Sequence, residues 1–332
     1  MKKIVLMFNL FATLLFSFSF PLNDYSKNNK ISATLMNDKE CKTNDSVVTI
    51  TTANNLISVS GVIIDEDENY VYIATSYANY NQAYHYEIVL NDYTRAKAFV
   101  VGYTKEDEVL LLKSKVDKYS YCVANISKSE YIDLYEFVDI RGKANYKDAV
   151  ANGEVTLVGV CRNCQEETYR NYYYTLITGE VDNYLIGAGV FDKTGGLLGI
   201  VLGREDKFKL GIRMLDITKL YSICYNLINY GKYEKNYIKY NLLDVNSLTN
   251  YQKYLYSLDE GVTRGVLVGS IHYLNYIIGG LNQGMIILSV NNVKVDNCYE
   301  LDNELSKYIK GSVVSIKART ITNSYKTYRI KL

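Results

Sequence analysis

Between Ser46 and Gly203 the hydrophobic positions fall in short runs, separated by turn residues such as Asn, Asp and Gly. The runs are rich in Tyr, Val, Ile and Thr, which favour extended structure. Short strands at regular spacing, without helical segments between them, are typical of β-sandwiches and β-barrels. They form two groups of about six, which predicts two small barrels side by side. The runs cover residues 46–52, 56–67, 70–78, 85–92, 95–104 and 108–115, then 136–143, 153–161, 172–180, 184–191 and 197–203.

One pair of these runs predicts a β-hairpin. The apolar segments Tyr184–Phe191 and Leu197–Leu202 flank Asp192–Gly196, which has the residue types of a tight turn. Within the first segment, Gly187-Ala188-Gly189 places three small residues where the backbone must bend sharply or approach another segment closely.

The pattern changes after Asp216. From there to Tyr230 the apolar residues recur at intervals of three and four, which predicts an amphipathic helix ending at Gly231. The remainder of the chain again favours strands, at 265–271, 285–295, 313–320 and 325–332, with one helical stretch at Leu301–Ile309. This predicts a separate, smaller α/β domain at the C-terminal end.

Composition narrows the classes of function. The 332 residues are enough for two domains, 48% are hydrophobic, and the net charge is +1 with no long block of one sign. Electrostatic attraction to nucleic acid is therefore not expected. Strands do not alternate with helices and there is no glycine-rich phosphate loop, which argues against a nucleotide-binding domain. No cofactor is expected.

The first residues have the pattern of an export signal. Lys2-Lys3 precede the apolar run Ile4–Phe20, which ends at Pro21. We expect a signal peptide at 1–21, cleaved or kept as an anchor, and a loose tail at 22–44. At seventeen residues the run is short for a membrane span. The mature chain is therefore expected in the periplasm, the cell envelope or the extracellular space.

Six cysteines are compatible with disulfides in an exported chain. The closest pair, Cys161 and Cys164, is expected to form a local disulfide or to remain as two thiols; a redox motif or half a metal site is less favoured. Only two histidines are present, and the acidic cluster Asp65–Glu68 lacks the spacing of a calcium loop. No metal site is expected.

Several segments resemble trypsin-like peptidases of the HtrA (Deg) type. The similar segments are Ser46-Val47-Val48, Gly61–Asp65, Tyr72–Thr75, Asp107–Lys113 and the hairpin around Gly187. The resemblance implies a mainly β chain: a trypsin-like double β-barrel at 45–214, a linking helix at 215–231 and a PDZ-like α/β domain at 232–332. It also implies assembly into a homotrimer.

The resemblance places the catalytic residues on positions that cannot perform the chemistry. The family's histidine falls on Ala78 and its aspartate on Glu108, which is otherwise expected to be a solvated residue of a charged turn. The serine falls on Ile186 or Gly187, and Gly187 belongs to the oxyanion region. Serine proteolysis needs a hydroxyl activated by an imidazole that a carboxylate orients. The prediction is therefore a pseudoprotease.

The alternative is an active trypsin-like serine endopeptidase of protein quality control, with a misaligned or non-standard triad. It would have to use His85, seven residues beyond the expected position, because His272 belongs to the PDZ-like segment. Bringing His85 into place would shift the well-matched residues Ile88–Leu90 out of register. An exposed histidine at a strand edge is the favoured interpretation of His85.

Peptide binding is the function that remains. PDZ domains bind an extended peptide as an added strand, and the loop before the receiving strand binds its carboxylate. The resemblance places that loop at Tyr237-Ile238-Lys239-Tyr240, with Lys239 in place of the usual glycine. Lys239 either blocks the required backbone conformation or adds a charge partner for the carboxylate. Peptide or protein C-termini and unfolded polypeptide are the expected partners; a domain that only packs against the barrels is the alternative.

Overall fold

The computed structural model describes residues 42–117, 121–128, 132–144, 146–161, 172–179, 182–205, 211–236, 238, 240–269 and 280–332. The expected signal peptide and most of the expected tail, together with His272, Cys164, Tyr237 and Lys239, lie outside these residues. No helix among the described residues is long and apolar enough to span a membrane.

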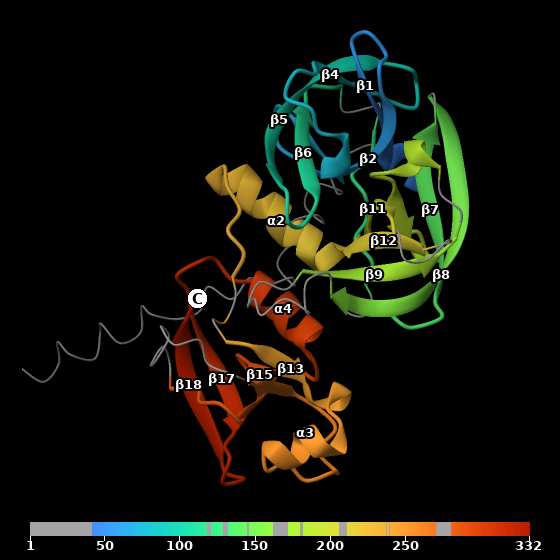
Figure 1. Cartoon of the computed structure of the whole chain (residues 1–332). Helices are drawn as coiled ribbons and strands as arrows, with labels where there is room; N and C mark the ends of the chain where they lie inside the picture. The colour runs from blue at the N-terminus through green and yellow to red at the C-terminus, as the bar shows by residue number, and fades with distance from the viewer. Residues whose placement is uncertain are drawn as a thin grey trace, which may run out of the picture.

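The first barrel is a closed antiparallel sheet with the strand order β1-β2-β3-β6-β5-β4 (Figure 1). Its strands are β1 (Val47–Thr52), β2 (Ser58–Glu66), β3 (Val71–Ser76), β4 (Tyr86–Val89), β5 (Arg95–Thr104) and β6 (Val109–Ser114). Alternate residues of β1 belong to different hydrophobic cores. Val48 and Ile50 fill the barrel, whereas Val47 faces the second barrel and the helix that follows it. Every residue of β1 is therefore buried.

The second barrel closes in the order β10-β11-β12-β9-β8-β7. Its strands are β7 (Phe137–Ala144), β8 (Lys147–Cys161), β9 (Tyr173–Thr178), β10 (Gly189–Phe191), β11 (Leu197–Arg204) and β12 (Gly211–Asp216). Two six-stranded barrels confirm the sequence prediction. The predicted strand at 184–191 is shorter than expected, because the 3₁₀ turn η3 (Asn183–Leu185) and Gly187, with φ of +88°, precede β10.

Helix α2 (Ile217–Tyr230) follows β12 and covers the junction of the two barrels (Figure 1). Leu220, Ile223 and Leu227 are buried in a core shared with strands of both barrels. The helix ends at Gly231, whose φ of +68° gives the left-handed termination predicted from the sequence.

The part of the chain after α2, here called the sheet domain, contains an antiparallel sheet in the order β13-β14-β15-β17-β18. Its elements are β13 (Leu242–Asp244), α3 (Asn250–Leu255), β14 (Val266–Val268), β15 (Ile286–Val290), β16 (Val293–Lys294), α4 (Cys298–Ser306), β17 (Val313–Arg319) and β18 (Tyr325–Lys331). The predicted fold class, a mainly β double barrel followed by a linking helix and a further α/β domain, is confirmed. Figure 1 shows α4 between this sheet and the second barrel.

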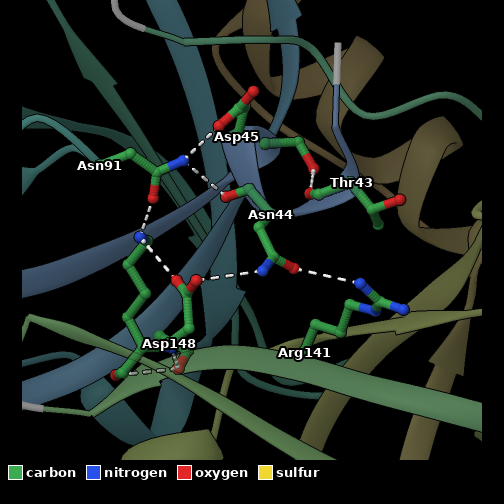
Figure 2. Close-up of polar contacts among 9 residues, drawn as sticks. Thr43, Asn44, Asp45, Asn91, Arg141 and Asp148 are labelled. Atoms are coloured by element: carbon green, nitrogen blue, oxygen red, sulfur yellow. Dashed lines mark hydrogen bonds and ion pairs between the residues drawn. The ribbon is translucent and has the colours of Figure 1, made fainter.

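The start of the described chain ties the two barrels together (Figure 2). In the 3₁₀ turn η1 (Thr43–Ser46), the Asn44 side chain donates to Asp148 (3.0 Å) and accepts from Arg141 (3.2 Å), both in the second barrel. Asn91, which follows β4, donates to the Asn44 carbonyl (3.0 Å) and to Asp45 (2.6 Å). Residues of both barrels thus converge on one short turn, which fixes their relative orientation.

Cys122 and Cys161 are both disulfide-bonded, whereas Cys224 and Cys298 are free and buried. The expectation that Cys161 could remain an unpaired thiol is therefore wrong. Burial raises the pKa of the Cys224 thiol above its ordinary range, so this residue stays protonated and inert within its core.

Candidate functional site

The candidate site lies where three loops of the two barrels meet, and the first loop carries Ala78. It is the 3₁₀ turn η2 (Tyr77–Asn79) at the end of β3. The Ser76 hydroxyl accepts from the Ala78 N–H (3.2 Å) and donates to the carbonyl of Leu202 in β11 (2.8 Å). The turn is therefore fixed to the second barrel, and Ala78 itself is exposed.

The second loop carries Ile186, whose side chain is half-buried after η3. The Ile186 N–H donates to the Asn183 carbonyl (3.2 Å), and the Ile186 carbonyl accepts from the Asn79 side chain (3.3 Å). Asn79 also donates to Thr75 (3.1 Å). The residue next to Ala78 therefore holds the Ile186 loop, and the structure brings these two positions together.

The third loop carries Glu108, between β5 and β6. Its carbonyl accepts from the Tyr77 N–H (2.8 Å), which places it beside η2. Its carboxylate pairs with Arg213 of β12 at 2.6 Å, and the two side chains are only 14% and 18% exposed. The expectation of a solvated Glu108 is wrong, because a cation from the second barrel folds against the turn. A cavity of about 10 Å³ beside this pair has room for no more than one water molecule.

Gly187 explains how the Ile186 loop approaches the first barrel so closely. A Cβ atom at this position would lie 2.0 Å from Thr75 Oγ1 and 2.4 Å from the Ser60 carbonyl oxygen, and φ is +88°. No side chain fits there, so position 187 cannot carry a nucleophile. Of the two positions that the sequence left open, only Ile186 accommodates a side chain.

The hydroxyl groups buried between the barrels were not singled out from the sequence. Ser60 donates to the Tyr184 carbonyl (2.7 Å) and accepts from the Lys143 N–H (2.9 Å), and Thr75 donates to the Ser60 carbonyl (2.8 Å). In the described part of the chain no imidazole is bonded to any of these hydroxyls. His85 is exposed before β4, and its carbonyl accepts from Ala53 (3.3 Å). Ser60 and Thr75 interrupt apolar runs, the one sequence signal that they are buried between packed strands.

Three tyrosine rings form an aromatic cluster beside η2. Tyr77 and Tyr80 stack with centroids 5.4 Å apart, and Tyr103 of β5 lies 5.1 Å and 4.6 Å from them. The cluster covers the first-barrel side of the site with flat, partly exposed apolar surface. No pattern in the sequence indicates that these three rings meet.

The four residues of the predicted carboxylate-binding loop are only partly described. Ile238 and Tyr240 are buried in the core of the sheet domain. Binding of a peptide carboxylate by this loop stays a prediction. Among the described strands, β13, which follows the loop, pairs with β14 alone and stands at the edge of the sheet. Its outer main-chain groups are the place where an added strand would bind.

Two closed six-stranded barrels in tandem, with three loops converging between them, form the trypsin-like double-barrel fold. Within that fold class the chain has the fold of HtrA-type proteases. It superposes on "HtrA-type protease AlgW with decapeptide" with a TM-score of 0.57 and 17% identity, over 86% of this chain and 94% of that chain. The serine endoprotease from Yersinia pestis gives 0.52 and 16%, over 89% and 98%.

A further AlgW structure, determined with a tripeptide, superposes with a TM-score of 0.57 and 19% identity, over 87% of this chain and 94% of that chain. No protein-family model and no curated protein matches the sequence. At these identities the likeness establishes the fold, and the activity has to be argued from the residues of this chain.

Proposed function

We propose that this chain is a catalytically inactive HtrA-like pseudoprotease that binds peptides or protein partners, chiefly through a PDZ-like sheet domain. The observation that carries the proposal is the contact between Asn79 and Ile186. It aligns the loops that would hold a histidine and a serine, and the side chains at those positions are those of Ala78 and Ile186. Neither can transfer a proton or attack a carbonyl.

Two further contacts support this proposal. The Glu108 carboxylate, which would orient an imidazole, is paired with Arg213. The Ile186 N–H, at the position of an oxyanion donor, already donates to Asn183. Loss of one triad member costs several orders of magnitude in rate, leaving only what binding and oxyanion donors supply. In this chain the histidine and serine positions carry Ala78 and Ile186, and the Glu108 carboxylate and the Ile186 N–H are bonded to other groups.

The alternative is an active serine endopeptidase with a non-standard triad. It would require one of the buried serines between the barrels to act as the nucleophile. Ser60 and Ser76 each donate to a main-chain carbonyl. Their hydroxyls are therefore held away from any role as an attacking group, and His85 is exposed elsewhere on the first barrel.

Peptide binding is supported by the edge of β13 that no described strand covers and by the solved structures of similar fold. The AlgW structures were determined with a decapeptide and with a tripeptide. A peptide added beside β13 would form main-chain hydrogen bonds with that edge, and its carboxylate would lie toward residues 237–240. The disulfide-bonded Cys122 and Cys161 support an exported protein, because disulfides persist in oxidising compartments. A homotrimer is proposed from the resemblance alone.

The proposal is tested with the purified full chain in two assays. Incubation with unfolded casein should give no fragments. Casein fragments that disappear in Ser60→Ala or Ser76→Ala would instead establish the endopeptidase. Fluorescent peptides with a free C-terminal carboxylate should bind, and the same peptides with an amidated C-terminus should bind much more weakly. Equal binding of the two forms would contradict carboxylate recognition by the sheet domain.

A further inference from the structure

A cavity of about 900 Å³ lies between the second barrel, the start of α2 and the sheet domain. Apolar side chains such as Val158, Leu198 and Ile217 line it from the barrel side. Residues of α4 and the end of β13 line it from the sheet domain. Clefts between domains are common positions for small-molecule sites. This one is separate from the loops around Ala78.

Asp216 lies in the wall of this cavity and is only 5% exposed. It stands at the N-cap of α2, yet its side chain makes no capping hydrogen bond. Instead, Oδ2 accepts from the Tyr299 hydroxyl. Its Oδ1 is buried and has no hydrogen bond of good geometry among the described residues, and the neighbour beside the carboxylate is the neutral Thr175 hydroxyl.

The charge of Asp216 also has no cationic partner in the described part of the chain. Burial raises its pKa to about 6, and the neighbouring hydroxyls of Tyr299 and Thr175 offset the effect of burial only in part. Among the described residues, no lysine, arginine or histidine contributes to this pKa. Buried carboxylates are normally paired with a cation, because an unpaired buried charge is costly. A buried carboxylate without a cation, placed in the wall of a cavity, is a candidate binding group for a positively charged ligand.

Other side chains in the described lining of the cavity are also negatively charged. Asp133 lies on the barrel side, and Asp244, Glu300 and Glu304 lie on the sheet-domain side. Among the described residues, the basic ones of the lining are Lys294 and Lys307. Lys294 pairs with Asp296 (3.0 Å), which is outside the lining, and Lys307 pairs with Glu304 (2.7 Å), so Asp133, Asp244 and Glu300 remain as acidic groups besides Asp216. The cavity therefore attracts positive charge.

The lining also indicates the kind of cation. Among the described residues no group of three or more His, Cys, Asp and Glu side chains could hold a metal ion. Acidic groups stand here beside aliphatic side chains. That combination suits a ligand with methylene groups and an ammonium group, because the methylenes pack on the apolar wall while the N–H groups donate to carboxylate oxygens.

We propose that this interdomain cavity binds an alkylammonium group, with Asp216 as the residue that accepts from it. The group belongs either to a free di- or polyamine or to a lysine side chain of a bound peptide. The second source rests on the proposed peptide-binding function, whereas the first does not.

The test uses the full chain and calorimetric titration at neutral pH and constant ionic strength. Putrescine and spermidine are the free-amine probes, and 1,4-butanediol is the neutral control. Asp216→Asn removes the charge. Asp259→Asn is the matched variant, since Asp259 is an exposed carboxylate of the sheet domain outside the cavity lining. We expect binding of the amines but not of the diol, weakened about tenfold or more in Asp216→Asn and unchanged in Asp259→Asn.

A second arm uses hexapeptides that differ only in one lysine or glutamine. A lysine preference that Asp216→Asn abolishes, without binding of free amines, assigns the site to a peptide side chain. If no peptide binds, the proposed peptide-binding function is contradicted. The titration with free amines then decides whether the cavity binds an alkylammonium group. The inference is overturned if neither amines nor lysine peptides bind in a way that depends on Asp216, or if Asp259→Asn weakens binding equally.

Discussion

Gly187 fixes the distance between the two barrels at the candidate site. Its positive φ and the absence of a side chain let the Ile186 loop lie directly on Thr75 and on the Ser60 carbonyl. The Gly187 N–H donates to the Val201 carbonyl (2.8 Å), which anchors the loop to β11. A residue with a Cβ would have to push this loop away from the first barrel.

Replacement of Gly187 by alanine is therefore expected to destabilise the fold by about 3 kcal/mol or more, because it adds a steric clash to left-handed backbone strain. Gly231→Ala is the matched control. Its φ is also positive, but nothing lies within 4 Å of the added Cβ. We expect it to cost about 1 kcal/mol. Urea unfolding of both variants measures the difference, and equal costs would contradict the close contact.

Asp216 should make stability depend on pH. Its pKa is raised by burial to about 6 from an ordinary value of 3.8, so the folded chain holds the proton more tightly than the unfolded chain. The stabilisation from this proton is complete below about pH 4 and is lost as pH rises through about 6. At 1.36 kcal/mol per unit, the loss is about 3 kcal/mol.

Asp216→Asn removes this titration. Relative to the wild type, the variant should therefore gain about 3 kcal/mol in free energy of unfolding between pH 4 and pH 7 in amine-free buffer. Denaturant unfolding of both proteins across this range measures the gain. A difference between the two proteins that stays constant with pH would show that Asp216 is not held in a buried, unpaired state.

Single residues of the site were only partly predictable. The positions Ala78, Glu108 and Ile186 could be proposed from the sequence because strands on either side set their register. The partner of Glu108 could not, since Arg213 lies 105 positions away and approaches only when the barrels pack. The same holds for Asn79, whose contact with Ile186 joins segments 107 positions apart.

At the scale of elements, α2 and α4 are joined by a buried ionic cluster. Asp302 of α4 accepts from Lys219 of α2 and from Lys235 of the following linker, both at 2.9 Å, and all three side chains are at most 11% exposed. Burial raises the pKa of the Asp302 carboxyl, but the two lysines outweigh that effect and hold it below its ordinary value. The cluster attaches the sheet domain to the helix that covers both barrels.

Asp302→Asn should release this attachment. It removes the carboxylate that is hydrogen-bonded to two buried ammonium groups, and breaking a buried pair in this way costs about 3–5 kcal/mol. Small-angle scattering should show a larger radius, and limited proteolysis should cut near residues 231–236. Glu234→Gln, which removes an exposed pair with Lys232 and Lys310, should leave both measurements unchanged. A compact Asp302→Asn variant would contradict the role of the cluster.

The elements themselves were largely predictable where they are long and periodic. Strands of the first barrel and α2 agree with the sequence patterns to within a few residues, because alternation and helical periodicity persist over whole segments. The elements that the sequence patterns did not predict are short. Strand β13 and helix α3 span three and six residues, too few for a periodic signal, and β13 is extended only because it pairs with β14.

The whole molecule has the double-barrel fold of HtrA-type proteases, and contacts between its converging loops join the two barrels. The Glu108–Arg213 pair and the Asn79–Ile186 contact both cross from one barrel to the other. The positions that would perform chemistry therefore hold the barrels together. The two proposed binding functions lie at the edge of β13 and in the cavity beside Asp216, both on the side of the sheet domain.

The measurement that tests the central claim most directly is the intact mass of the full chain after exposure to a fluorophosphonate, which labels only an activated serine. We expect the mass to remain unchanged under conditions that fully label an active serine endopeptidase used as a control. A single adduct, mapped to one serine and lost when that serine becomes alanine, would contradict the account and make the chain a hydrolase.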